Sequence, residues 1–246
     1  MSTQPAAVVA RLTVSGLLGR RRAAVLMVLP LVLLVLAGVV RAVGGSDTSS
    51  AVGLLGGLGL GTVVPLVCVV VGTGVIGPEI EDGSILYLLS KPLRRSSIIT
   101  SKLAVAVLTA WAFLVPAVLL AGVVLVGGTA RIAVAYAVAA VAGAVAYCAL
   151  FLLLAVVTPN AVIIGLLYAL VWETTIAGVV PGARALSVRQ WALSFAESVV
   201  GADAERLGVS SAVALLPSLV LLTVVTVGAT ALAVQRLRVL RLGGEA

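Results

Sequence analysis

The chain has 246 residues, of which 62% are hydrophobic and 10% are charged, and its mean hydropathy is +1.28. Soluble domains are about 45–50% apolar and about 25% charged, so this composition excludes a soluble globular core and indicates a lipid environment. The net charge of +7 comes from Lys and Arg at the ends of apolar runs, without interleaved aromatic residues, which argues against nucleic-acid binding.

Six apolar runs are long enough to cross a membrane, because a bilayer core of about 30 Å requires about 20 residues of helix. The sequence therefore predicts an all-α integral membrane protein, a six-helix bundle that forms one domain over residues 1–246. A short Thr158-Pro159-Asn160 break predicts a tight hairpin between the fourth and fifth helices. The runs cover residues 23–40, 52–77, 103–126, 132–157, 161–180 and 212–234.

The distribution of basic residues predicts which side of the membrane each loop occupies. With the N-terminus inside, eleven Lys and Arg residues fall in cytoplasmic segments and five in outer segments. We therefore expect a multi-pass protein of the cell membrane with both termini cytoplasmic. Residues 1–22 then form a cytoplasmic or interfacial lead, and we interpret the first run as a permanent helix and not a cleaved signal.

The second run carries a small-residue pattern typical of helix packing. Gly53, Gly57 and Gly61 recur every four residues, which places them on one face of an α-helix and predicts close approach of another helix. Cys68 and Cys148 both lie within apolar runs, so we expect them to be packing residues and not a disulfide.

The cytoplasmic link at residues 78–95 is the first polar segment long enough to have a function. Pro78 suits the first position of a helix, and acidic residues follow in the first turn, where the helix dipole favours them. Apolar residues come next, so we expect a helix of about three turns at the membrane surface. The link at residues 78–95 is either a solvated loop that only fixes topology or a docking segment for a cytoplasmic partner. The candidate docking residues are Glu79, Glu81, Asp82, Gly83, Leu88, Leu89, Pro92, Arg94 and Arg95.

The outer loop at residues 181–211 is the second such segment. Val188, Trp191, Phe195 and Val199 have near-helical spacing, which predicts a short interfacial helix with Trp191 as its membrane anchor. We interpret it as a cap over the bundle, with an extracellular gate or a partner contact as the alternative.

Glu173 is the ionisable residue within the six runs, and Trp172 precedes it. A carboxylate in lipid is costly, so we expect it to face the bundle interior or water, with a partner. Arg131 and Arg184, at the outer ends of neighbouring runs, are the candidate partners. Glu173 and Trp172 are thus candidates for a substrate path or gate, with a purely structural inter-helix bond as the alternative.

Two motifs resemble those of ABC type-2 exporter permeases. The first is Glu79-x-x-x-Gly83 with Leu88-Leu89, Pro92 and Arg94/Arg95, followed by Lys102 at the start of the next helix. The second, in the fifth run and the loop after it, is Tyr168-x-x-x-Trp172-Glu173 followed by Pro181-Gly182-x-Arg184-x-Leu186-Ser187.

The resemblance implies a permease subunit that pairs with a second permease copy or paralogue and with two cytoplasmic ABC ATPase subunits. It implies that residues 79–89 form a coupling helix in a groove of the ATPase, and that export proceeds by alternating access. The chain carries no Gly-x-x-x-x-Gly-Lys-Ser/Thr phosphate loop, no histidine and no paired carboxylates in a span. We therefore expect no enzyme activity and no cofactor in this chain, with ATP and Mg²⁺ on the partner.

Two other classes of protein remain open from the residues. An ion-coupled secondary carrier also suits six spans and one buried carboxylate, although no matched pair of broken helices is evident. A membrane scaffold or assembly factor without transport activity is the other.

Overall fold

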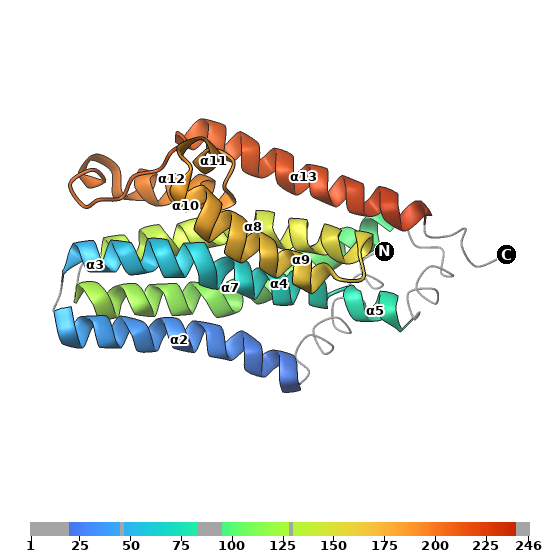
Figure 1. Ribbon diagram of the computed structural model, residues 1–246, viewed down its shortest axis with the longest axis horizontal. Coiled ribbons are helices and arrows are strands. Elements are labelled where there is room, and N and C mark those ends of the chain that lie inside the picture. Colours follow the sequence, from blue (N-terminus) through green and yellow to red (C-terminus); the bar gives the residue numbers. More distant parts are fainter. Residues whose placement is uncertain (1–19, 45–46, 83–94, 128–129, 240–246) are drawn as a thin grey trace, which may run out of the picture.

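The structure is a computed structural model that describes residues 20–44, 47–82, 95–127 and 130–239. All regular elements in these residues are helical (Figure 1). Six of the described helices are long and apolar enough to cross a membrane, which confirms the predicted helical six-span architecture. The spans are Ala24–Gly44, Thr48–Ile80, Arg95–Val126, Arg131–Val157, Ala161–Val179 and Leu215–Leu237.

Several spans are built from more than one helical element. The first, third, fourth and sixth spans are single α-helices, whereas π-helical stretches, η1 and η2, interrupt the second and fifth. The elements in order are α2 (Arg20–Gly44), α3 (Thr48–Gly53), η1 (Leu54–Val63), α4 (Val64–Gly74), α5 (Gly77–Glu81), α7 (Arg95–Val126), α8 (Ala130–Val157), α9 (Ala161–Leu167), η2 (Tyr168–Ile176), α10 (Ala177–Val179), α11 (Pro181–Arg184), α12 (Val188–Val200), η3 (Gly201–Asp203) and α13 (Leu215–Val239).

The bundle has two distinct ends (Figure 1). At one end, called the α5 end below, lie α5, the start of α2 and the end of α13. At the opposite end, called the α12 end, lie the start of α3 together with α11 and α12. The first and last described helices therefore begin and finish at the same end, as an even number of spans requires.

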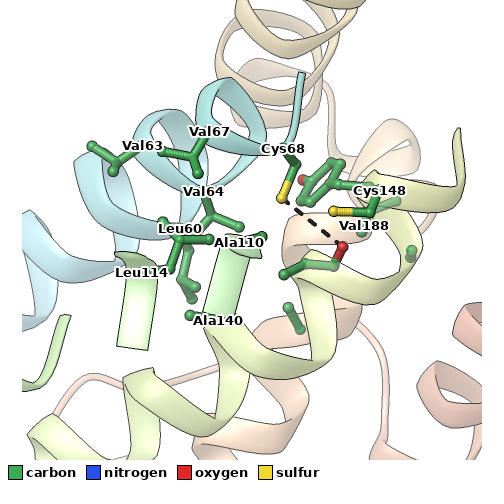
Figure 2. Packing of buried hydrophobic residues seen from close by; sticks show 14 of the residues in the cluster. Leu60, Val63, Val64, Val67, Cys68, Ala110, Leu114, Ala140, Cys148 and Val188 are labelled. Atoms are coloured by element: carbon green, nitrogen blue, oxygen red, sulfur yellow. Dashed lines mark hydrogen bonds between the residues drawn. The ribbon is translucent and has the colours of Figure 1, made fainter. Parts of the chain in front are cut away.

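The alanine-rich α8 lies at the centre of the bundle and packs against α4, α7, α12 and α13. Its small side chains let neighbouring helices approach closely, which is the main source of packing energy between helices in lipid. Figure 2 shows one part of this core, in which Leu60 and Val64 lie near Ala110 and Leu114 of α7 and Ala140 of α8.

The two cysteines are buried and form no disulfide. The thiol of Cys68 donates a weak hydrogen bond to the carbonyl oxygen of Ala144, 3.9 Å away, and Cys148 lies in the same cluster (Figure 2). The prediction that both are packing residues is confirmed.

The outer helices have broad apolar surfaces that the described residues leave uncovered. In the most apolar window of each span, 67% of residues are buried in the second and 61% in the fourth. The corresponding shares are 22% in the first and fifth spans and 17% in the sixth. Because exposed residues such as Leu31, Ile163 and Leu216 are aliphatic, these faces suit lipid or another membrane helix.

The close approach of another helix that Gly53, Gly57 and Gly61 predict is not seen among the described residues. Gly53 ends α3, and Gly57 and Gly61 lie in the π-helical stretch Leu54–Val63. A Cβ at Gly53 or Gly57 would meet no atom within 4 Å, whereas one at Gly61 would lie 3.4 Å from Cδ of Arg189. Only Gly61 of the three therefore accommodates a neighbour, and that neighbour is a side chain.

Close backbone approach instead occurs at glycines elsewhere in the core. A Cβ at Gly122 of α7 would lie 2.6 Å from Cβ and 2.7 Å from Cα of Ala133 in α8. A Cβ at Gly72 of α4 would lie 2.9 Å from Cβ of Phe151. These two contacts fix the separation of α8 from α7 and from α4.

We predict that Gly122→Ala lowers the free energy of unfolding by about 1–3 kcal/mol, because the added methyl overpacks the α7–α8 contact. The measurement is an SDS titration of purified protein. Chemical modification of the thiols of Cys68 and Cys148, which are buried in the folded state, reports the fraction unfolded. Gly228→Ala in α13 is the matched control, since its Cβ would meet nothing within 4 Å. Equal destabilisation by both substitutions would contradict the assignment of Gly122 as a packing constraint.

Candidate functional site

A short helix, α5, begins at Gly77, one residue before the first helical position that the sequence predicts at Pro78. Pro78 lies in the first turn of α5 and Glu79 is the acidic residue of that turn. Asp82 is the exposed C-cap of the described part, which ends the five-residue α5. The other predicted docking residues that follow, Gly83, Leu88, Leu89, Pro92 and Arg94, lie outside the described residues.

The structure pairs Glu79 with Lys102, a partner that the sequence did not predict. Nζ of Lys102 lies 2.7 Å from Oε1 of Glu79 and donates a second hydrogen bond of 2.7 Å to the carbonyl oxygen of Val75. The side chain of Lys102 is 0% exposed and that of Glu79 is 28% exposed. Burial of an ammonium is very costly without such partners, so this ion pair fixes α5 against α7.

The Val75 carbonyl extends the same junction to a third element. Val75 is the C-cap residue of α4, and the C-terminal end of a helix carries a partial negative charge. Lys102 therefore meets one full and one partial negative charge, and its ammonium joins α4, α5 and α7.

Arg95, a basic residue of the predicted docking segment, contacts the last span. The start of α7 is at Arg95 and not at residue 103 as expected from the apolar run, so Arg95 is helical. Its Nη1 donates a 2.6 Å hydrogen bond to the carbonyl oxygen of Leu237, close to the end of α13. The first turns of α7 therefore hold both α5 and α13 at the α5 end.

The carboxylate of Glu173 forms a hydrogen-bonded cluster towards the α12 end. Glu173 is 0% exposed and lies on η2. Oε1 accepts from the hydroxyl of Tyr168 at 3.0 Å and from the backbone N–H of Val188 at 3.1 Å. Oε2 accepts from the hydroxyl of Ser187 at 2.5 Å and from the backbone N–H of Arg189 at 3.4 Å.

These contacts place the carboxylate on the N-terminus of α12. Ser187 is the N-cap, and its hydroxyl oxygen also accepts from the backbone N–H of Gln190 at 3.4 Å. A helix N-terminus has unpaired N–H groups and a partial positive charge, so a buried carboxylate there is stabilised without a basic side chain. The cluster ties the fifth span to the segment that follows it and brings together both halves of the second motif.

The prediction that Arg131 or Arg184 is the partner of Glu173 is wrong. Arg131 forms an exposed ion pair with Asp203, with 3.0 Å between Nη1 and Oδ2. Arg184 donates through Nη2 to the carbonyl oxygen of Gly178 at 2.9 Å. The backbone of α12 satisfies Glu173 instead, and sequence composition alone does not reveal backbone donors. Trp172 is partly exposed beside it.

The prediction of a helix with Trp191 in the outer loop is correct for the helix and wrong for the tryptophan. α12 packs against α8 and α13, and Trp191 is only 5% exposed. Its indole N–H donates to the carbonyl oxygen of Ala185 at 2.8 Å. Trp191 is therefore a core residue that fixes the turn before α12, not an anchor that faces lipid.

Each of the two charged clusters joins helices. Within the part of the chain that the structure describes, no group of three or more His, Cys, Asp or Glu residues is placed to hold a metal ion. What each cluster does is to connect a short helix at one end of the bundle to a membrane span.

Comparison with known proteins adds no family assignment. No family model matches the chain, and no curated protein is significantly similar to it.

We predict that Glu173→Ala lowers the free energy of unfolding by at least about 1–3 kcal/mol, because the buried donors of Tyr168, Ser187 and α12 lose their acceptor. Hydrogen exchange should show faster opening of the amides of Val188 and Arg189. Glu205→Gln, an exposed substitution near η3, is the control and should change neither quantity. Unaltered amide protection in Glu173→Ala would show that the carboxylate does not cap α12.

Proposed function

We propose that the chain is the membrane-spanning permease subunit of an ATP-driven transporter, in which a separate ABC ATPase binds ATP and Mg²⁺. The observation that carries the proposal is the ion pair between the buried Lys102 and the partly exposed Glu79. It links the first turn of the predicted docking helix to a membrane span, and both residues belong to the motif that resembles type-2 exporter permeases.

The ion pair supports a mechanical mode of action. A partner that displaces α5 acts on Glu79, and the ion pair resists separation because the buried ammonium of Lys102 would lose its counter-charge. The displacement therefore reaches α7 through Lys102, and α4 through the Val75 carbonyl. Arg95 carries it on to α13. In this proposal the partner's ATP cycle shifts the bundle between two access states. The shift is as large as the difference in the partner's affinity for the two access states in each nucleotide state.

The arrangement of the helices fits the other parts of the assembly. α5 and the described ends of the first and last helices lie at one end, which we assign to the cytoplasm from the bias of Lys and Arg (Figure 1). The uncovered apolar faces of α2, α9 and α13 are available to lipid and to a second permease copy or paralogue. Export from the cell is the direction that the resemblance favours.

The first test is isolation of the complex from its native membrane with a mild detergent. We expect a separate polypeptide with a phosphate-binding loop to co-purify, and its vanadate-sensitive ATP hydrolysis to change when the permease is present. A protein that transports along an ion gradient with no ATPase bound would establish the secondary-carrier alternative. A stable complex without nucleotide turnover or transport would favour the scaffold.

The second test uses the ion pair. We expect Glu79→Gln and Lys102→Met each to weaken coupling of transport to ATP hydrolysis by about 0.5–2 kcal/mol, measured as transported substrate per ATP in the reconstituted complex. The double substitution should weaken this coupling by less than the sum of the two single substitutions, because neither charge is then left unpaired.

Thr100→Ala is the matched control for this test. Thr100 is exposed on the same segment of α7 and bonds only to carbonyls of the preceding turn, Ser96 and Ser97. Coupling that is as sensitive to Thr100→Ala as to Glu79→Gln would contradict a specific role for the ion pair.

A further inference from the structure

A polar cavity of about 320 Å³ lies at the α12 end, between η1, α8 and the segment from α10 to α12. It is separate from the Lys102–Glu79 junction, which is at the opposite end of the bundle (Figure 1). The side chains of Tyr136, Arg184, Arg189 and Gln190 line it, together with glycines of α3 and η1.

Arg189 places a guanidinium in this cavity without a matching acid. The side chain is partly buried and lies across Gly61, with Nε and Cζ 3.4 and 3.5 Å from the position of a Cβ there. Nε is buried and has no hydrogen-bond partner among the described residues. A buried N–H donor without a partner is unusual, and it indicates a site where a ligand atom completes the bonding.

Arg184 supplies a second guanidinium at the same cavity. It is exposed, and it uses one N–H group to bond the carbonyl oxygen of Gly178. A guanidinium has five N–H donors, so others remain to bind a ligand. Gln190 adds an amide group whose oxygen already accepts from the backbone N–H of Ala212 at 3.1 Å, which leaves its N–H₂ group as a donor.

No acidic side chain balances the two arginines at this cavity. Among the described residues, the lining includes no Asp or Glu. Glu173 accepts a hydrogen bond of 3.4 Å from the backbone N–H of Arg189, but its carboxylate is fully buried, is not part of the lining, and bonds to the α12 N-terminus and Tyr168. The cavity therefore presents an excess of positive charge and of hydrogen-bond donors.

Glycines make the room for a ligand between these donors. Gly53, Gly56 and Gly57 line the wall formed by α3 and η1, and a Cβ at Gly53 or Gly57 would meet open space. At Gly56 the hydroxyl of Tyr136 approaches to 3.3 Å of the Cβ position, so this glycine lets the ring lie along the wall.

We propose that this cavity binds a phosphate group, held by Arg184 and Arg189 with Tyr136 and Gln190 at its sides. Guanidinium groups match the tetrahedral oxyanion through paired N–H···O bonds, and a partly desolvated pair of them strengthens each bond. The phosphate belongs either to a lipid headgroup or to a soluble phosphate ester, since the cavity lies near the end of the membrane spans. The site does not depend on an ATPase partner, so the permease proposal and this one stand or fall separately.

The test is calorimetric titration of the purified full chain in a neutral detergent. The probes are inorganic phosphate and short-chain phosphatidic acid, with the matching diacylglycerol, which lacks the phosphate, as the negative probe. We expect at least one phosphate-bearing probe to bind and the diacylglycerol not to bind. Binding of phosphatidic acid but not of inorganic phosphate would identify a lipid headgroup as the ligand. Binding of both would show that a soluble phosphate group is sufficient.

Three variants make the test specific to the cavity. Arg184→Gln and Arg189→Gln should each raise Kd by roughly ten-fold, because each removes charge-assisted hydrogen bonds. Gly57→Leu keeps both charges but fills part of the cavity, and it should also abolish or weaken binding. Arg131→Gln, at the same end but not in the lining, should bind as the unaltered chain does.

Two results would overturn the proposal. One is the absence of binding by either phosphate-bearing probe to a chain whose thermal unfolding remains cooperative. The other is equal affinity for the unaltered chain, Arg184→Gln and Gly57→Leu. Arg184 is exposed, so its substitution tests the site even where Arg189→Gln impairs folding.

Discussion

The carboxylate of Glu173 accepts four hydrogen bonds inside the bundle, and the architecture of the α12 end depends on them. Within lipid every polar group must find its partner in the protein, because no water is present to provide one. Glu173 meets this constraint with the N-terminus of α12, and α12 in turn packs against the central helix α8. One buried charge thus sets the position of a 13-residue helix and of Arg189 within it.

At the α5 end the buried charge is positive, and it too finds its partners within the protein. Lys102 is buried, and it is satisfied by a carboxylate on α5 and by the C-terminal carbonyl of α4. A short helix is therefore fixed to a long span at each end of the bundle. The connection at the α12 end is a hydrogen-bonded cap within one segment of chain, whereas the connection at the α5 end is an ion pair between two spans. An ion pair between two spans suits the transmission of a displacement from one helix to another, which is why we place the proposed coupling there.

The two π-helical stretches connect these clusters to the cavity. η1 and η2 pack against each other, η2 carries Tyr168 and Glu173, and η1 carries the glycines that line the cavity. Helices of this type are rare in proteins and occur frequently at functional sites. A Cβ at Gly53 or Gly57 would meet no described atom within 4 Å, and Arg184 and Arg189 line the same cavity as these glycines.

The sequence by itself determined the number of membrane helices and most of their limits, because runs of about 20 apolar residues have no other stable conformation in lipid. It also indicated a helix start at Pro78, the second residue of α5, and the burial of Glu173, since both follow from local chemistry. Only the tertiary structure decided which groups meet. Glu173 bonds to backbone N–H groups and not to an arginine, Lys102 reaches Glu79 across 23 residues, and Trp191 lies in the core. Such pairings depend on helix rotation and on π-helical winding, and neither property has a signal in hydropathy or residue spacing.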